Sequence, residues 1–146
     1  MNDRLKSYIF VFVQFVCLGI ILFTGPVIPS NYFLSAIELL AGVLAIWAIR
    51  TMRIGTFNVT PNIKPGGNLV TNGPYRFIRH PMYTSLLLAT LPMILNRCTP
   101  ERSVSWLVLL FDLVLKLRFE EELLSKAFVD YRTYMQRTRR LIPFLY

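Results

Sequence analysis

The histidine of this chain, His80, stands where a basic loop meets an apolar segment, within GPYRFIRHPMY at 73–83. Pro81 suits the first turn of a helix, so we expect His80 at or near the N-cap, where unpaired backbone N–H groups and the helix dipole favour an anion. Tyr83 follows three residues later and should project from nearly the same helix face. This spacing predicts a site for a carboxylate or phosphate. The alternative is that Arg79 and His80 only anchor a helix at lipid head groups.

A second charged cluster lies at 116–122, where two cations precede three successive glutamates. Consecutive residues fan around a helix, so Glu120, Glu121 and Glu122 cannot all face one partner, whereas Lys116 lies one turn from Glu120. A carboxylate facing inward would bind a cationic group such as an ammonium or a sulfonium. The alternative is a solvated helix face with one ion pair between Lys116 and Glu120.

Two further acids, Glu38 and Asp112, lie within apolar segments. A charge at the centre of a membrane helix costs about 2.5 to 3.5 kcal/mol on insertion scales, so each acid should face a polar interior or be protonated. A structural explanation pairs Glu38 with Gln14 of a neighbouring helix and Asp112 with a loop arginine. A functional explanation makes the two acids a site, for example in a small transporter.

The elements that must position these residues are apolar helices, because 54% of the 146 residues are hydrophobic and 16% are charged. Segments at about 8–28 and 32–49 each approach the roughly 20 residues that a spanning helix requires. Shorter apolar segments follow at 81–95 and 103–117. We therefore predict an all-α, polytopic membrane protein with about four transmembrane helices in two hairpins.

The rest of the chain completes a single domain over 1–146, in which 1–52 is the first hairpin. Residues 53–146 then hold a cofactor-binding loop, the second hairpin and a C-terminal helix. The pattern at 116–137 places Leu124, Phe128, Tyr131 and Met135 on one stripe, which predicts an amphipathic cytosolic helix.

The distribution of charge predicts orientation as well as partners. The net charge is +8, and fourteen of the sixteen Lys and Arg residues lie outside the turn that holds Arg97 and Arg102. The positive-inside rule places both termini and the loop at 50–79 in the cytoplasm. Because the basic residues flank apolar segments, we expect membrane lipids as partners and no nucleic acid. Cys17 and Cys98 lack metal-ligand spacing, so no metal site is predicted.

Several ordered pieces of the sequence resemble the isoprenylcysteine carboxyl methyltransferase family and its phospholipid methyltransferase relatives. They are LVTNGPY at 69–75, RHPMY at 79–83, Glu120-Glu121 with Leu124 and Phe128, then Tyr131, Tyr134 and RLIPF at 140–144. The resemblance covers about 58–144 and is that of a compact, prokaryotic-type member. It implies an all-helical membrane fold in which cytosolic segments enclose S-adenosylmethionine while a lipid tail enters between transmembrane helices.

Carried over by position, the resemblance implies a cofactor site made of ten residues. They are Gly67, Asn68, Leu69, Val70, Tyr75, His80, Pro81, Met82, Tyr83 and Glu120. His80 and the helix start suit the cofactor carboxylate, and Glu120 suits its ammonium.

The catalytic candidates are Lys116, Arg118 and Glu121. The resemblance implies methylation of a lipid-like acceptor such as the carboxylate of a prenylated cysteine, with a phospholipid or another small amphiphile as the alternative. Lys116 stands where prenylcysteine enzymes carry a substrate-binding arginine, and Gly67 where some members carry a histidine, so the identity of the acceptor stays open. A carboxylate nucleophile needs only orientation by Lys116 or Arg118, whereas an amine must lose a proton, with Glu121 or a head-group phosphate as acceptor. A non-enzymatic scaffold that binds anionic lipid is the alternative of another class.

Overall fold

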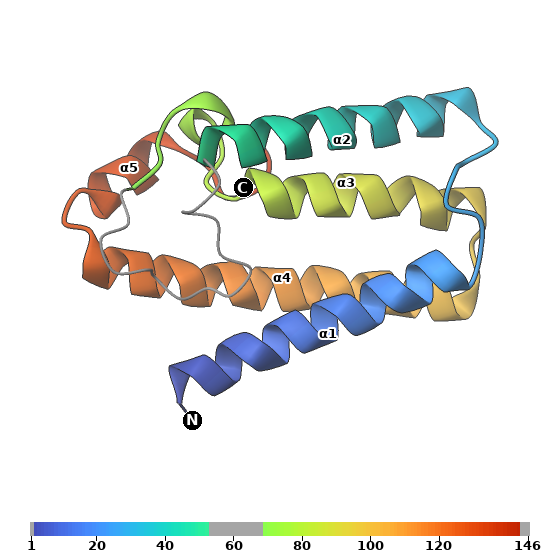
Figure 1. Ribbon diagram of the computed structural model, residues 1–146, viewed down its shortest axis with the longest axis horizontal. Helices are drawn as coiled ribbons and strands as arrows, with labels where there is room; N and C mark the ends of the chain where they lie inside the picture. Colours follow the sequence, from blue (N-terminus) through green and yellow to red (C-terminus); the bar gives the residue numbers. More distant parts are fainter. Residues whose placement is uncertain (1, 53–68, 144–146) are drawn as a thin grey trace.

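The computed structural model describes residues 2–52 and 69–143 (Figure 1). This part of the chain forms five α-helices and one short 3-10 helix. They are α1 (Asp3–Phe23), α2 (Tyr32–Met52), η1 (Gly73–Arg76), α3 (Pro81–Asn96), α4 (Pro100–Ala127) and α5 (Tyr131–Arg137). The prediction of an all-helical chain is confirmed for the described residues. Apart from the helices, the chain makes one isolated parallel bridge, between Ile78 and Arg139.

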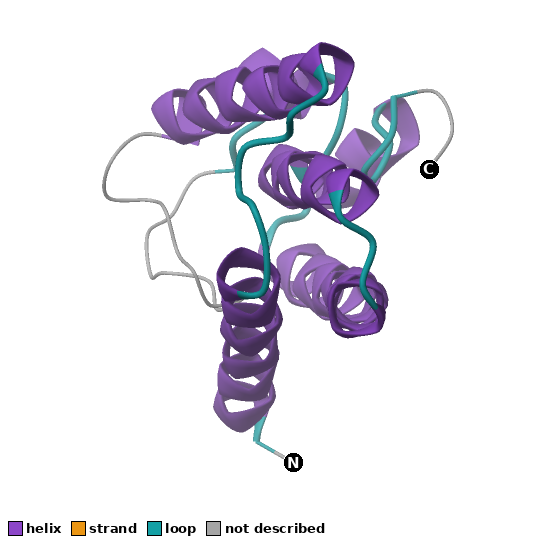
Figure 2. Cartoon of the chain, turned by 90° about the vertical axis from the view of Figure 1, so that its right-hand side faces the viewer, coloured by secondary structure: helices purple, strands orange, loops and turns teal. Residues whose placement is uncertain are grey.

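The four long helices pack in two pairs that differ from the order of the chain. The most extensive contacts join α2 to α3 and α1 to α4, while α3 and α4 touch over a smaller surface. Figure 2 shows α1 well separated from the other helix of its predicted hairpin. The sequence therefore gives the correct helix order, and the structure adds that α1 and α2 each pack mainly on a helix of the second predicted hairpin. The turn at 24–31 is long enough for α2 to cross to α3.

Among the described helices, α1 and α2 are long and apolar enough to cross a membrane. Their outward faces carry large exposed apolar side chains, including Phe12, Phe15, Leu39 and Leu40. This pattern is the one expected of helices that contact lipid, and it supports membrane association. α3 has 16 residues and α4 has 28, so four membrane spans remain a prediction.

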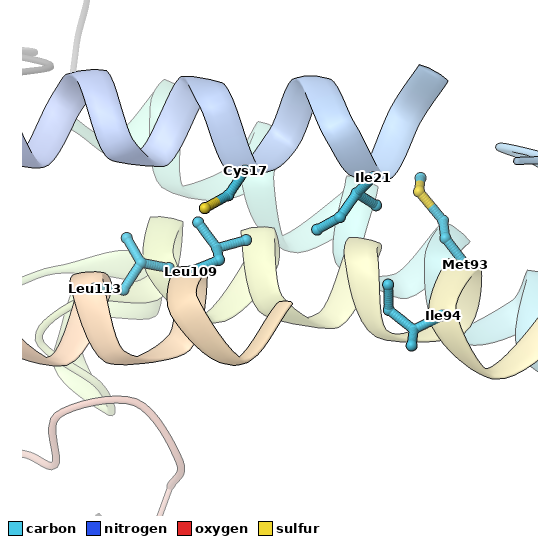
Figure 3. Close-up of a cluster of buried hydrophobic side chains, with 6 residues drawn as sticks. All are labelled: Cys17, Ile21, Met93, Ile94, Leu109 and Leu113. Carbon is cyan, nitrogen blue, oxygen red and sulfur yellow. The ribbon is translucent and has the colours of Figure 1, made fainter. Parts of the chain in front are cut away.

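A small apolar core joins α1, α3 and α4 (Figure 3). Cys17 and Ile21 of α1 meet Leu109 and Leu113 of α4, and Met93 and Ile94 of α3 extend the cluster. Cys17 packs there as a small apolar residue, as free cysteines commonly do. The core holds α1 against the rest of the bundle, which matters for the site because α1 contributes a polar residue to it.

The C-terminal segment differs from the single helix predicted at 116–137. α4 runs without interruption to Ala127, Phe128 adopts extended backbone, and a separate α5 begins at Tyr131. The break turns the chain so that the Tyr131 side chain is buried and Met135 lies against Ser125. An unbroken helix would carry this apolar stripe away from the bundle, so the predicted amphipathic helix is divided in two.

The chain after α5 returns to the start of α3. Backbone N–H groups of Arg79 and His80 donate to the carbonyls of Arg139 and Arg140, and the Arg139 N–H donates to Phe77. The Thr84 hydroxyl donates to the Leu141 carbonyl nearby, at 2.7 Å. These bonds fix the residues that precede α3 against the C-terminal segment.

Candidate active site

A cavity of about 280 Å³ lies between the helices, beside the start of α3. It receives residues from α1, α2, η1, α3 and α4, so segments far apart in the sequence meet there. Its lining comprises Gln14, Ala45, Met52, Tyr75, Arg79, His80, Pro81, Met82, Tyr83, Ser85, Leu86, Lys116 and Glu120. Seven of the thirteen predicted site residues are thus brought together in one place.

His80, Tyr83 and Glu120 form the polar centre of this cavity. The His80 and Tyr83 rings stack with centroids 5.3 Å apart and an angle of 1° between their planes. The Tyr83 hydroxyl donates to Glu120 Oε2 at 2.8 Å, and His80 Nδ1 lies 3.6 Å from the same oxygen. The expectation that His80 and Tyr83 share one helix face is confirmed, and the structure adds that Glu120 joins them.

The position of His80 follows from the local backbone. His80 is the N-cap of α3 and Pro81 is its first residue, as the sequence predicts. The side chain is buried, and its Nε2 lies 3.4 Å from Glu121 Oε1. Nε2 is thus directed toward Glu121 behind the cavity, whereas Nδ1 is directed toward Glu120 in the cavity lining.

Tyr75 reaches the cavity from η1, which begins at Gly73. Gly73 has a φ of 56°, and a Cβ there would also collide with the side chain of Thr51, so glycine is required. The Tyr134 hydroxyl donates to the Tyr75 carbonyl at 2.6 Å and holds η1 in place. Burial, and then the nearby Glu120 carboxylate, raises the pKa of Tyr75, so its hydroxyl stays protonated.

Behind the cavity, Glu121 is the centre of an ion-pair network. Arg79 Nε and Arg140 Nε donate to its two oxygens at 2.7 and 3.0 Å, and Arg79 also donates to the Met135 and Thr138 carbonyls. The Arg79 side chain is 7% exposed. It therefore contacts protein groups, and the alternative that Arg79 serves only to anchor lipid head groups does not describe this geometry.

The network strongly favours the ionised form of Glu121. Burial by itself would raise its pKa, but hydrogen bonds and positive charge from His80 and Arg79 outweigh burial and lower the pKa to about 2. A carboxyl group with so low a pKa is a weak proton acceptor. Glu121 also does not line the cavity.

Lys116 is buried, with 1% of its surface exposed, and lines the cavity one turn before Glu120. Its Nζ donates to Gln14 Oε1 of α1 at 2.7 Å and lies 5.3 Å from the centre of the Tyr83 ring. The ion pair considered between Lys116 and Glu120 is thus replaced by a hydrogen bond to α1. A buried ammonium needs such partners because leaving water is costly.

The two acids of the apolar segments do not find the partners suggested for them. Gln14 bonds to Lys116 and not to Glu38, and one oxygen of Glu38 and one of Asp112 are buried without a hydrogen-bond partner in the described part of the chain. Arg79 binds Glu121, and Arg102, which lies in α4, binds backbone carbonyls. The described residues include no group of three acids, cysteines or histidines placed to hold a metal ion.

The remaining predicted residues lie around the cavity or away from it. Leu69 and Val70 are half-buried in the segment before η1, and Arg118 is exposed on α4. Gly67 and Asn68 lie outside the described residues. Sequence reasoning missed as site residues Gln14, Ala45, Met52, Arg79, Ser85 and Leu86, of which Gln14 was visible as the polar interruption of the first apolar segment.

The chemistry of the lining suits a small molecule that carries both charges and an apolar body. Glu120 offers a carboxylate, Lys116 an ammonium and His80 an imidazole ring, while Met82 and Leu86 provide apolar contact. Stacked aromatic rings beside a carboxylate also favour a cation. S-adenosylmethionine has an ammonium, a carboxylate and a sulfonium, so the residues present fit this group.

Comparison with known proteins gives the family. A search of curated proteins finds no match. The profile of the phospholipid methyltransferase family matches residues 30–130, more than two thirds of the chain. The matched segment contains every residue that lines the cavity except Gln14. The chain therefore belongs to the phospholipid methyltransferase family, which indicates a membrane methyltransferase.

Proposed function

We propose that this protein uses S-adenosylmethionine to methylate the head-group amine of a phospholipid that reaches the cavity from the bilayer. The observation that carries the proposal is the meeting of Tyr75, His80, Tyr83 and Glu120 in one cavity beside apolar, outward-exposed helices. The family match supports a phospholipid acceptor. Both termini and the cofactor site would face the cytoplasm, in accordance with the distribution of Lys and Arg.

In this proposal the cofactor lies along the start of α3. When bound, S-adenosylmethionine supplies a methyl group on a positively charged sulfur. Glu120 accepts hydrogen bonds from an ammonium, and the first turn of α3, with the His80 ring at its N-cap, faces a carboxylate. Tyr75, Leu69, Val70, Pro81 and Met82 contact the adenosine portion, and Gly67 and Asn68 belong to the same proposed set.

The acceptor would lie next to Lys116, one turn along α4 from Glu120. Methyl transfer is an in-line displacement, and holding the two reactants in line accounts for a large share of its rate. An amine must lose a proton to act as nucleophile, and the carboxylate placed to accept that proton is Glu120, which lines the cavity. Glu121 was a candidate for this step, but its low pKa and its two arginine partners suit a role in holding His80.

The carboxylate of a prenylated cysteine is a second candidate acceptor, and the buried Lys116 ammonium is the observation that favours it. A carboxylate is already ionised at neutral pH and would need only orientation. Lysine offers it a point charge, whereas arginine would offer two parallel hydrogen bonds. We therefore expect poor methylation of a prenylcysteine, and an increase of that activity in Lys116→Arg with little change in cofactor binding.

Methyl transfer in lipid nanodiscs tests the proposal. Purified protein is supplied with methyl-labelled S-adenosylmethionine and either phosphatidylethanolamine or N-acetyl-S-farnesylcysteine. Label should appear on the phospholipid amine, and Glu120→Ala should reduce the rate by more than about tenfold, the loss expected for one charge-assisted hydrogen bond. Folded wild-type protein that methylates neither acceptor would contradict the proposal. Efficient transfer to farnesylcysteine alone would replace the phospholipid by the second candidate.

A further inference from the structure

Gln14 of α1 is the cavity residue that lies outside the segment matched by the family. It is also the polar residue that interrupts the first apolar segment, where a polar side chain is costly unless it has a partner. Packing of α1 on α4 through Cys17, Ile21, Leu109 and Leu113 fixes its position (Figure 3). A helix that could have served only as a membrane anchor therefore reaches the site.

The hydrogen bond between Gln14 and Lys116 determines which end of the amide faces Lys116. An ammonium group has donors and no acceptor, so the amide oxygen must face Lys116, as it does at 2.7 Å. The amide nitrogen then carries two N–H donors, and it has no hydrogen-bond partner among the described residues. Lys116 has further N–H donors beyond the one given to Gln14.

Two donor groups thus lie side by side at the edge of the cavity, one neutral and one charged. Glu120, the acidic member of the site, lies one helical turn away on α4 and already accepts from Tyr83. Paired donors of this kind suit an oxyanion, because charge-assisted hydrogen bonds to phosphate or carboxylate oxygens are stronger than neutral ones. The arrangement separates a region for an anion, at Gln14 and Lys116, from a region for a cation, at Glu120.

We propose that Gln14 and Lys116 together bind the anionic oxygens of the methyl acceptor, and that α1 thereby contributes to acceptor specificity. The inference rests on the proposed function for its choice of acceptor, the phosphodiester of a phospholipid. A phosphate held there lies beside Glu120, so the head-group amine a few bonds away reaches the cationic region. The carboxylate of a lipidated amino acid shares the same chemistry and is the other source to distinguish.

Equilibrium binding of short-chain lipids tests the inference without requiring methyl transfer. The full chain in detergent is titrated calorimetrically with dihexanoylphosphatidylethanolamine, with dihexanoylglycerol, which lacks the phosphate, and with N-acetyl-S-farnesylcysteine. The variants are Gln14→Met, which removes the amide, and Gln14→Glu, which still accepts from Lys116 but replaces the N–H donors by a negative charge. Phe12→Met, on the exposed face of the same helix, is the matched control.

The phospholipid should bind wild type and Phe12→Met alike, and more tightly than dihexanoylglycerol. Gln14→Met should weaken phospholipid binding by about tenfold and Gln14→Glu by more, because repulsion is added to a lost hydrogen bond. Binding of dihexanoylglycerol and of S-adenosylmethionine should stay within about twofold of wild type, since the first has no oxyanion and the second places its carboxylate at the start of α3, away from Gln14.

Gln14→Glu separates an oxyanion site from a merely structural partner of Lys116, because it keeps that partner. Unchanged phospholipid affinity in Gln14→Glu, or equal losses for the phospholipid and dihexanoylglycerol, would overturn the inference. Farnesylcysteine binding that is lost in both Gln14 variants would support the oxyanion site and identify a carboxylate as a ligand. Absence of methyl transfer with intact Gln14-dependent phospholipid binding would count against the proposed function alone.

Discussion

At the scale of single residues, the adjacent Glu120 and Glu121 have different surroundings and different roles. Glu120 lines the cavity and accepts a hydrogen bond from Tyr83, whereas Glu121 lies behind it between Arg79 and Arg140. The sequence predicts that consecutive acids fan around a helix, but it does not say which acid faces the site. That depends on the rotation of α4 against α3 and on the returning C-terminal segment, which are tertiary features.

Removal of Arg79 should destabilise the protein strongly. Arg79→Leu takes one partner from a buried carboxylate, and breaking a buried ion pair in this way typically costs about 3 to 5 kcal/mol. Its bonds to the Met135 and Thr138 carbonyls would be lost as well. Thermal unfolding in detergent should therefore occur at a clearly lower temperature. Arg76→Leu, at an exposed position in η1, is the control and should unfold close to wild type.

The same network predicts a dependence of stability on pH. The pKa of Glu121 is lowered from its ordinary value of 4.5 to about 2, so its ionised form is favoured in the folded state. This contribution is fully present above about pH 5 and is lost as the pH falls toward 2. Unfolding curves at pH 3 to 6 should show a decline that is weaker in Glu121→Gln. Parallel declines in both proteins would show that other groups control acid unfolding.

At the scale of elements, one buried cation, Arg102, holds together the end of the bundle where short turns join α1 to α2 and α3 to α4. The Arg102 guanidinium is fully buried and donates to four backbone carbonyls, those of Ile21, Pro26, Met93 and Arg97. It thereby joins the last turns of α1 and α3 to the start of α4, where carbonyl groups at helix ends lack partners within the helix. The sequence indicates only a cation in a polar turn, because nothing in the pattern shows that the side chain points inward.

Replacement of Arg102 by methionine should lower the unfolding temperature more than Arg97→Met, which removes an exposed cation from the same turn. Several carbonyls would lose their donor, and each unsatisfied buried group costs about 1 to 3 kcal/mol. Gly25→Ala should act in the same direction, because a Cβ at Gly25 would lie 2.7 Å from an Arg102 nitrogen. Equal unfolding temperatures for Arg102→Met and Arg97→Met would show that the buried contacts add no stability.

At the scale of the whole molecule, one end of the bundle holds short turns and the other holds the candidate site. Figure 1 shows the two short turns at one end, and the N-terminus, the start of α3 and α5 at the other. The second end also holds the cavity and most of the basic residues. Hydropathy and charge thus predict the helices and the end that carries the site. They do not predict that α1 packs on α4, nor that Gln14 meets Lys116, because such pairings arise from contacts between distant segments.

This arrangement predicts that both termini lie in the cytoplasm. The ground is that fourteen of sixteen Lys and Arg residues then lie on the cytoplasmic side. Reporter fusions at Asn2 and Tyr146 test the prediction. A reporter that requires the cytoplasm should be active at both ends. Activity of a reporter that requires the opposite side, at either end, would exclude an even number of spans with the site facing inward.

Calorimetric titration with S-adenosylmethionine most directly tests the central claim, that the cavity around His80 and Glu120 binds this cofactor. The wild-type protein should bind it, and His80→Ala and Glu120→Ala should each weaken binding by more than about tenfold, or roughly 1.4 kcal/mol, while the protein stays folded. Glu122→Ala removes an exposed carboxylate two residues from Glu120 and should bind like wild type. Wild-type affinity in both folded site variants would contradict the account.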